Sequence, residues 1–347
     1  MDARPIRSRP AVSRRGVLRL GILAASGIAY RRSARAAERV RIVGLLTGLA
    51  LNDPLMSTKP SDDSRARLPG LIRDLARYGW VLGSNLRLEI RSSVGPAGAR
   101  DKAAQELIDL RPDIILTNSS IETAAVMVRT RTIPIVFATS ADPVGSGFVD
   151  SLARPGGNAT GFTNSDAEVG GKWLQFLKEA DPRLRRVGVF LNPATSPRQG
   201  RFFLDPLESA AGELGLSVKA VPIGDPSQIE AAVAACAGDP AVGIVVAVDS
   251  YLVGQRRPLV DAITRYRVPA IYPFRYFMDV GGLMSYGPAL EVLAAEYINL
   301  ILRGAKPGDL PVQSPRRYEL LLNRKAAQAL GLILPVSLLA RADQIVE

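Results

Sequence analysis

Short apolar runs alternate with amphipathic stretches along most of the chain. The apolar runs predict strands, and the stretches in which apolar residues recur every three or four positions predict helices. Predicted strands are 40–46, 86–91, 113–117, 133–138, 186–191, 217–221, 243–248 and 269–272, and predicted helices are 65–78, 100–110, 121–131, 170–180, 202–214, 229–237 and 255–266. This order is typical of parallel βαβ units, so we expect an α/β fold.

The strand–helix units form two groups, which lie before and after the turn-rich segment 154–164. That segment predicts a crossing between two lobes, and two further crossings are predicted at Gly281-Gly282 and in the Pro- and Gly-rich stretch 306–315. We therefore expect two Rossmann-like lobes with parallel sheets, joined by a three-segment hinge. The expected N-terminal lobe is 37–160 plus about 281–312, and the expected C-terminal lobe is 161–280 plus about 313–347.

Residues 1–36 have the pattern of an export signal. Arg14 and Arg15 precede an apolar run from Gly21 to Tyr30, and an A-x-A motif predicts cleavage after Ala36. The paired arginines resemble a twin-arginine (Tat) signal, although an ordinary Sec signal remains an alternative. The apolar run is too short to span a bilayer, so we expect a periplasmic protein with no stable membrane insertion.

Composition excludes several classes of chemistry. The chain has no histidine, and Cys236 is its one cysteine. His-containing triads, His- or Cys-ligated metal sites and internal disulfides are therefore excluded. We expect no metal and no cofactor, and composition leaves only carboxylates, Lys, Ser and Tyr for catalysis.

The net charge of +11 is unevenly distributed. Nine arginines and a single acid fall within residues 1–36, which leaves 35 basic against 32 acidic residues in the rest of the chain. The body carries no long basic run with interleaved aromatic residues, so no nucleic-acid partner is expected.

Polar residues follow the predicted strands, at the edge where open parallel sheets bind ligands. The candidate ligand-binding residues are Thr47, Asn118, Ser119, Ser120, Thr139, Ser140, Asn192, Asp249 and Ser250. Hydroxyls at a helix start have two interpretations: they cap the helix, or they mark an anion site at its N-terminus. For Asp249 the alternatives are a helix cap, an ion pair with Arg256 or Arg257, and recognition of a ligand ammonium group.

Aromatic residues are concentrated in 272–277, and core packing is the default for most of them. Tyr272 and Phe274 are the two predicted to line an apolar part of a ligand. Together with hydroxyls at helix N-termini and a carboxylate, such a wall would suit an α-amino acid.

Several stretches resemble a known family. They are RPDII at 111–115 followed by TNSS, IPIVF at 133–137, and the segments 142–147, 151–161, 281–288 and 338–345, of which 151–161 is the most specific. In these the chain resembles the tryptophan/tyrosine-type substrate-binding proteins of ABC transporters, which have the type I periplasmic-binding fold. The resemblance covers essentially residues 39–347.

The resemblance implies a monomeric protein whose two lobes close on a small-molecule ligand without catalysis, with an ABC permease and an ATPase as partners. It supports Ser119, Ser120, Thr139, Ser140, Asn192 and Asp249 as cleft positions. Three alternatives remain: a periplasmic receptor of the same fold that reports to a membrane sensor, an enzyme using a carboxylate pair, and a cytoplasmic regulator domain. The leader argues against the last of these.

Overall fold

The structure is a computed structural model that describes residues 39–56, 67–164, 166, 168–289 and 294–347. The predicted export signal, with Arg14, Arg15 and the cleavage site after Ala36, lies outside these residues. Residues 41–347 form one compact unit, and this unit contains two sheets.

The first lobe is built on a five-stranded parallel sheet of order β2-β1-β3-β4-β5. Its strands are β1 (Arg41–Thr47), β2 (Leu86–Ser92), β3 (Ile114–Thr117), β4 (Ile135–Ser140) and β5 (Ala159–Thr163). Its helical segments are η2 (Pro54–Met56), α1 (Arg67–Arg77), α2 (Ala99–Asp109), α3 (Ser120–Met127), α9 (Ala294–Leu302) and η6 (Pro307–Asp309).

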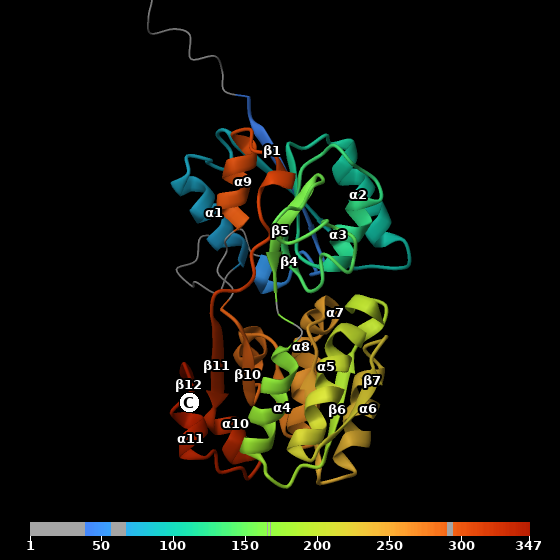
Figure 1. Ribbon diagram of the computed structural model, residues 1–347, viewed down its shortest axis with the longest axis vertical. Helices are drawn as coiled ribbons and strands as arrows, with labels where there is room; N and C mark the ends of the chain where they lie inside the picture. Colours follow the sequence, from blue (N-terminus) through green and yellow to red (C-terminus); the bar gives the residue numbers. More distant parts are fainter. Residues whose placement is uncertain (1–38, 57–66, 165, 167, 290–293) are drawn as a thin grey trace, which may run out of the picture. The chain divides into compact units, whose positions relative to one another are not determined.

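Alternation along the strands distributes the core of this lobe over both faces of the sheet. In β1, Val43 and Leu45 join the buried cluster that contains α1 and α9, whereas Leu46 joins the cluster that contains α2 and α3. Successive side chains of a strand point to opposite faces, so one strand supplies both clusters. The two helix pairs accordingly lie on opposite sides of the sheet (Figure 1).

The second lobe is built on a seven-stranded sheet of order β12-β11-β10-β9-β8-β6-β7. Its strands are β6 (Arg186–Leu191), β7 (Ser217–Pro222), β8 (Val242–Val246), β9 (Ala270–Tyr272), β10 (Met284–Pro288), β11 (Tyr318–Asn323) and β12 (Gln344–Val346). Its helical segments are α4 (Val169–Ala180), η3 (Pro197–Gly200), α5 (Arg201–Ala211), η4 (Gly212–Leu214), α6 (Gln228–Ala237), α7 (Ser250–Gly254), α8 (Arg256–Arg265), η5 (Arg275–Val280), α10 (Arg324–Ala329) and α11 (Val336–Leu339).

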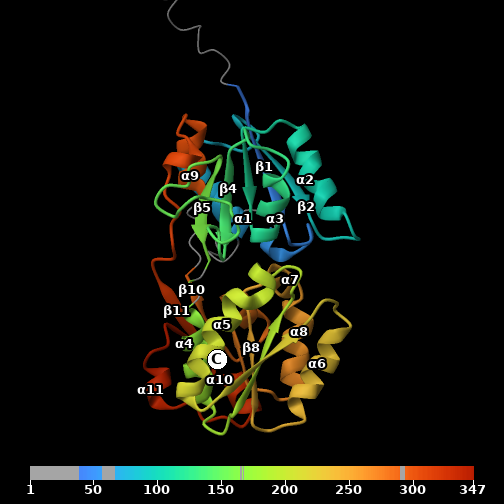
Figure 2. The same ribbon diagram turned by 45° about the vertical axis from the view of Figure 1, so that its right-hand side comes forward.

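Two strand glycines let helices pack closely on this sheet. A Cβ at Gly243 would lie 2.9 Å from Leu177 of α4, and a Cβ at Gly188 would lie 3.2 Å from Cys236 of α6. Gly188 pairs with Ile244, the residue after Gly243, so the two glycines face opposite sides and α4 and α6 cover opposite faces. Figure 2 shows α6 and α8 together beside β8.

The chain crosses between the two sheets three times, which is the number expected, but the second crossing follows β10 and not Gly281-Gly282, which lie before β10 in the second lobe. The crossings follow β5, follow β10, and precede β11. Two of them are joined: Phe162 bridges to Gln313, and the Gln313 N–H donates to the Gly161 carbonyl oxygen at 3.0 Å. Gly161 has a φ of +153°, and a Cβ there would lie 2.0 Å from the Phe137 carbonyl oxygen, so this position requires glycine.

The expected boundaries and sheet pattern need correction at three points. The boundary at about 281 assigns β10 to the first lobe, whereas β10 pairs with β9 and β11 of the second sheet. The boundary at 160 falls within β5, which belongs entirely to the first sheet. The second sheet is not wholly parallel, because β10 and β11 are antiparallel.

Candidate functional site

Three strand ends of the first lobe are tied together by Asn118. Its Oδ1 accepts from the Gly48 N–H at 3.0 Å, and its Nδ2 donates to Thr47 Oγ1 at 2.8 Å. The Thr139 hydroxyl donates to the Asn118 carbonyl oxygen. These contacts join the ends of β1, β3 and β4, the edge at which parallel sheets bind ligands.

The first turn of α3 begins at this edge without a side-chain cap. Ser119 occupies the N-cap position with an extended backbone (φ −161°, ψ 170°), yet its hydroxyl donates to Glu122 instead of capping the helix. The N-cap side chain therefore makes no hydrogen bond to the first N–H groups of α3. These groups and the positive end of the helix dipole can bind an anion.

Glu122 lies behind Ser119 and is fully buried. Its Oε1 accepts from the Ser93 hydroxyl at 2.6 Å, and its Oε2 accepts from Ser119. Burial raises the pKa of Glu122, an effect that its hydrogen bonds with Ser119 and Ser93 partly oppose. Glu122 thus fixes the orientation of the Ser119 hydroxyl.

Asp249 caps α7 in the second lobe. Its Oδ1 accepts from the Leu252 N–H at 3.1 Å, and its Oδ2 accepts from the Ser196 and Thr195 hydroxyls at 2.6 and 2.7 Å and from the Asn192 N–H at 3.3 Å. Burial raises its pKa against these hydrogen bonds. Of the alternatives left open by the sequence, the structure contains the helix cap; Arg256 instead pairs with Asp53.

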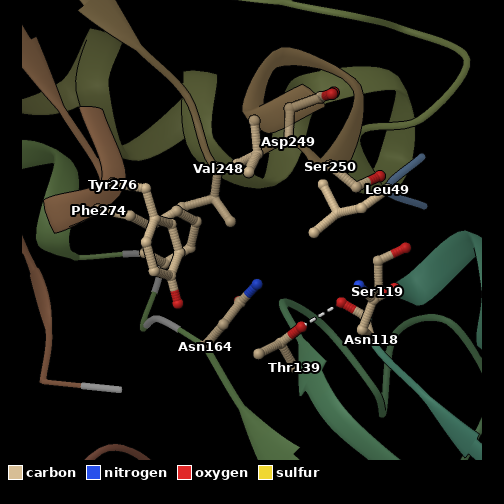
Figure 3. A pocket seen from close by; sticks show the side chains of 11 residues that line it. Leu49, Asn118, Ser119, Thr139, Asn164, Val248, Asp249, Ser250, Phe274 and Tyr276 are labelled. Atoms are coloured by element: carbon tan, nitrogen blue, oxygen red, sulfur yellow. Dashed lines mark hydrogen bonds between the residues drawn. The ribbon is translucent and has the colours of Figure 1, made fainter. Parts of the chain in front are cut away.

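A pocket lies between these two sets of residues (Figure 3). It encloses about 410 Å³ outside protein atoms, part of which is open to solvent. Its lining residues are Leu49, Asn118, Ser119, Thr139, Asn164, Val248, Asp249, Ser250, Val253, Phe274 and Tyr276. They come from both lobes and from Asn164, which follows β5. The Asp249 carboxylate is turned away from Asn118 and Thr139 (Figure 3), toward its hydrogen-bond donors.

One wall of the pocket is apolar and aromatic. Phe274 and Tyr276 lie with their ring centroids 6.0 Å apart and their planes at 43°. Leu49, Val248 and Val253 continue the apolar surface. The pocket therefore combines a polar side formed by the first lobe with an apolar side formed mainly by the second lobe.

The structure brings six of the predicted site residues to this pocket: Asn118, Ser119, Thr139, Asp249, Ser250 and Phe274. The other five do not line it: Thr47, Ser120, Ser140, Asn192 and Tyr272. Ser120 and Ser140 contact each other through their hydroxyls at 3.1 Å. Thr139 and Ser140 belong to β4 itself, whereas the sequence places them after the strand.

Tyr272 corrects the prediction of an aromatic wall. It is 1% exposed and stacks on Phe277, with ring centroids 4.9 Å apart. It packs in the core of the second lobe because it belongs to β9. The aromatic partner of Phe274 at the pocket is Tyr276, from η5.

Sequence reasoning missed Leu49, Asn164, Val248, Val253 and Tyr276. Asn164 lies in the stretch predicted as a crossing, and the strand it follows, β5, is not evident from the sequence, so no strand end pointed to it. The apolar residues carry no signal either, because Val248 and Val253 resemble core positions.

The described residues contain no group of carboxylates and cysteine that could hold a metal ion. In the same part of the chain, every helix is too short or too polar to cross a membrane.

Residues 60–346 match the family of ABC transporter substrate binding proteins. A protein of Clostridioides difficile described as a tyrosine-binding protein is 26% identical over 267 residues, 76% of each chain.

Two solved structures share the fold. A conserved domain protein of Vibrio cholerae has a TM-score of 0.78 at 24% identity and covers 88% of this chain and 100% of its own. An ABC domain of Streptococcus pneumonia in complex with L-Trp has a TM-score of 0.78 at 22% identity and covers 88% of this chain and 99% of its own. The expected fold of two α/β lobes is confirmed.

Proposed function

Because this chain belongs to the family of ABC transporter substrate-binding proteins, and so is a solute-binding protein, we propose that its ligand is an α-amino acid with an apolar side chain. The observation that carries the proposal is the pocket itself, which sets the uncapped first turn of α3 opposite the Phe274–Tyr276 wall. The N–H groups of α3 would donate hydrogen bonds to the ligand carboxylate. The apolar wall would take its side chain.

Two relatives support this ligand class. One is described as a tyrosine-binding protein, and another was solved in complex with L-Trp. Asp249 contributes less than the sequence suggested, because four donors of its own lobe already serve its carboxylate. We therefore propose that recognition rests on the ligand carboxylate and side chain, with Asp249 as a positioning residue for Ser250 and α7.

Capture would proceed by hinge closure. The three crossings form the hinge, with lobe 1 comprising about 41–163 plus 294–313 and lobe 2 comprising about 169–288 plus 318–347. Contacts made only between closed lobes would favour the closed form once ligand is bound. Closure requires no nucleophile, in keeping with a family whose members are substrate-binding proteins and not enzymes.

Members of this family act with ABC transporters and are typically extracytoplasmic. We propose that this protein works as a monomer in the periplasm and delivers its ligand to a permease and an ATPase. Residues 1–36 would direct export and be removed after Ala36. Mass spectrometry of the secreted protein would test this, and a mature N-terminus at any residue other than Ala37 would contradict it.

Isothermal titration of the protein from Ala37 with L-tyrosine, L-tryptophan, L-phenylalanine and L-phenylalaninamide would test the ligand class. We expect at least one of the acids to bind and the amide, which lacks the carboxylate, to bind much more weakly. Ligand at 100 times its dissociation constant should raise the free energy of unfolding by about 2.7 kcal/mol.

A matched pair of variants tests the aromatic wall. Phe274→Leu should weaken binding, whereas Phe202→Leu, which removes a half-buried ring of α5 outside the pocket, should not. Equal affinity for acid and amide would exclude carboxylate recognition at α3. Binding of sugars or purines in place of all four probes would leave the solute-binding role and refute the amino acid assignment.

A further inference from the structure

A second compartment adjoins the candidate pocket and is the larger of the two. It encloses about 790 Å³ outside protein atoms, part of it open to solvent. Ser250, the first residue of α7, lines both spaces. The other lining residues come from both lobes: Gly48, Ala50, Asp53, Ser93, Val94, Gly95, Arg100, Ile121, Glu122, Thr195, Tyr251, Gly254 and Gln255.

The two acidic residues of this second compartment are already satisfied. Asp53 accepts two hydrogen bonds from the guanidinium of Arg256, at 2.8 and 2.9 Å. Glu122 is fully buried, and each of its oxygens accepts from a serine hydroxyl. Neither carboxylate needs a cation from a ligand.

Arg100 is the charged group of this lining that lacks such a partner. It lies in the first turn of α2, and within the described part of the chain its guanidinium makes no hydrogen bond or ion pair. The side chains of Ser250 and Gln255 line the same space from the second lobe, and they too form no hydrogen bond with described residues. Their donors and the cation of Arg100 complement an anion.

We propose that the second compartment binds an anionic group of the ligand, a carboxylate or a phosphate, between Arg100 of the first lobe and Ser250 and Gln255 of the second. The inference rests on the proposed amino acid function. The ligand would then occupy the candidate pocket, extend past Ser250, and place a second acidic group in the second compartment. Arg100 thereby becomes the residue that selects acidic ligands.

The test compares ligands that differ by one anionic group. The first pair is L-phenylalanine and 4-carboxy-L-phenylalanine, and the second is L-tyrosine and O-phospho-L-tyrosine. Dissociation constants are measured by isothermal titration for the native protein, Arg100→Ala and Lys102→Ala. Lys102 is exposed on the same helix outside the compartment, so its variant removes the same charge without changing the lining.

We expect at least one anionic member to bind roughly tenfold or more tightly than its uncharged match. Arg100→Ala should abolish that preference without changing the affinity for the uncharged member, and Lys102→Ala should change neither. The pair that shows the preference identifies carboxylate or phosphate as the anion. Within the described residues Arg100 makes no hydrogen bond or ion pair, and its charge is the smallest of the influences on the buried Glu122, so the melting temperature of Arg100→Ala should stay close to that of the native protein.

Each contrary result has a distinct meaning. If the uncharged members bind and the anionic ones bind equally or more weakly, the proposal is wrong and the amino acid function stands. An anionic preference that survives Arg100→Ala also overturns it. If none of the four probes binds, both this inference and the amino acid assignment fail.

Discussion

The ion pair between Asp53 and Arg256 joins the two lobes, and removing it should weaken ligand binding more than folding. Asp53 lies in the segment between β1 and α1 of the first lobe, and Arg256 begins α8 of the second. Their side chains are 10% and 12% exposed, and two parallel hydrogen bonds of 2.8 and 2.9 Å connect them. A bidentate pair of this kind is among the stronger ones in proteins.

The expected loss of ligand affinity depends on which form of the protein contains the ion pair. If the lobes separate, both side chains return to water, so the pair stabilises only the closed form. A coupling of about 1–3 kcal/mol between two contacting charges corresponds to a change of about 5- to 150-fold in the ratio of closed to open protein. Ligand affinity should fall by that factor, because an open form must first close to hold ligand.

The assay is isothermal titration with a bound amino acid, carried out on Asp53→Asn, Arg256→Gln and the double variant. Arg256 also donates to the Val253 carbonyl oxygen at 2.9 Å within its own lobe, so Asp53→Asn is the cleaner of the two single variants. Arg257→Gln, an exposed neighbour, is the matched control. The double variant should lose little more affinity than either single variant.

Two results would contradict this prediction. One is an unchanged dissociation constant in Asp53→Asn, which would mean that the pair is equally present with and without ligand. The other is full additivity in the double variant, which would mean that the two side chains act independently. Small-angle scattering of the ligand-free variants would show whether the lobes have moved apart.

Three further predictions concern residues that line the pocket or the adjoining compartment. Burial raises the pKa of Glu122, so the stability contributed by this group is complete below its unfolded value of 4.5 and is lost as pH rises through the folded pKa. Glu122→Gln should therefore raise the melting temperature more at about pH 7.5 than at about pH 4.5, and an equal shift at both would contradict this. Asp249→Ala leaves the Ser196 hydroxyl and the start of α7 without an acceptor. The free energy of unfolding, measured with urea, should therefore fall by about 2–4 kcal/mol. A variant that keeps its stability and loses only ligand affinity would instead support direct recognition of the ligand by Asp249. A Cβ at Gly48 would lie 3.1 Å from Glu122 Oε1 of its own lobe and 3.4 Å from the Ser250 Cβ of the other lobe, so Gly48→Val should lower both the melting temperature and the ligand affinity; an unchanged dissociation constant would contradict this.

Most of the fold could be predicted because its strands are locally apolar and its helices locally amphipathic. The predicted strand 186–191 coincides with β6, and the other seven predicted strands differ from the observed ones by one or two residues at their ends. Four strands were missed: β5, β10, β11 and β12. Of these, β11 carries an apolar run at 320–322 that could have indicated a strand, whereas the other three lack such a run. β5 contains Gly161 within a turn-rich stretch, and β10 contains Gly287 and Pro288, so their strand conformation depends on pairing with distant segments.

The sequence could predict only those site residues whose position follows directly from the end of a strand or the start of a helix. Asn118, Ser119, Asp249 and Ser250 were accessible because each directly follows a strand or begins a helix. The sequence could not show that Tyr276, and not Tyr272, lines the pocket, because this depends on how η5 directs its side chains after β9. The role of Asp249 was also hidden, since Thr195 and Ser196 reach it from a loop more than fifty residues away in sequence.

The three crossings affect the order in which the two lobes can fold during synthesis. The sheet of the first lobe is complete at Thr163, but α9, which covers one of its faces, follows β10 of the second lobe. Two residues of the first lobe have their partners on α9. Trp80 Nε1 donates to Asn299 Oδ1 at 3.1 Å, and the ring of Phe162 packs against that of Tyr297 with centroids 4.8 Å apart. A nascent chain leaving the ribosome therefore keeps an apolar face of its first lobe uncovered while most of the second lobe is synthesised. Neither lobe is a contiguous fragment, so a chain that stops before α9 would contain no finished lobe.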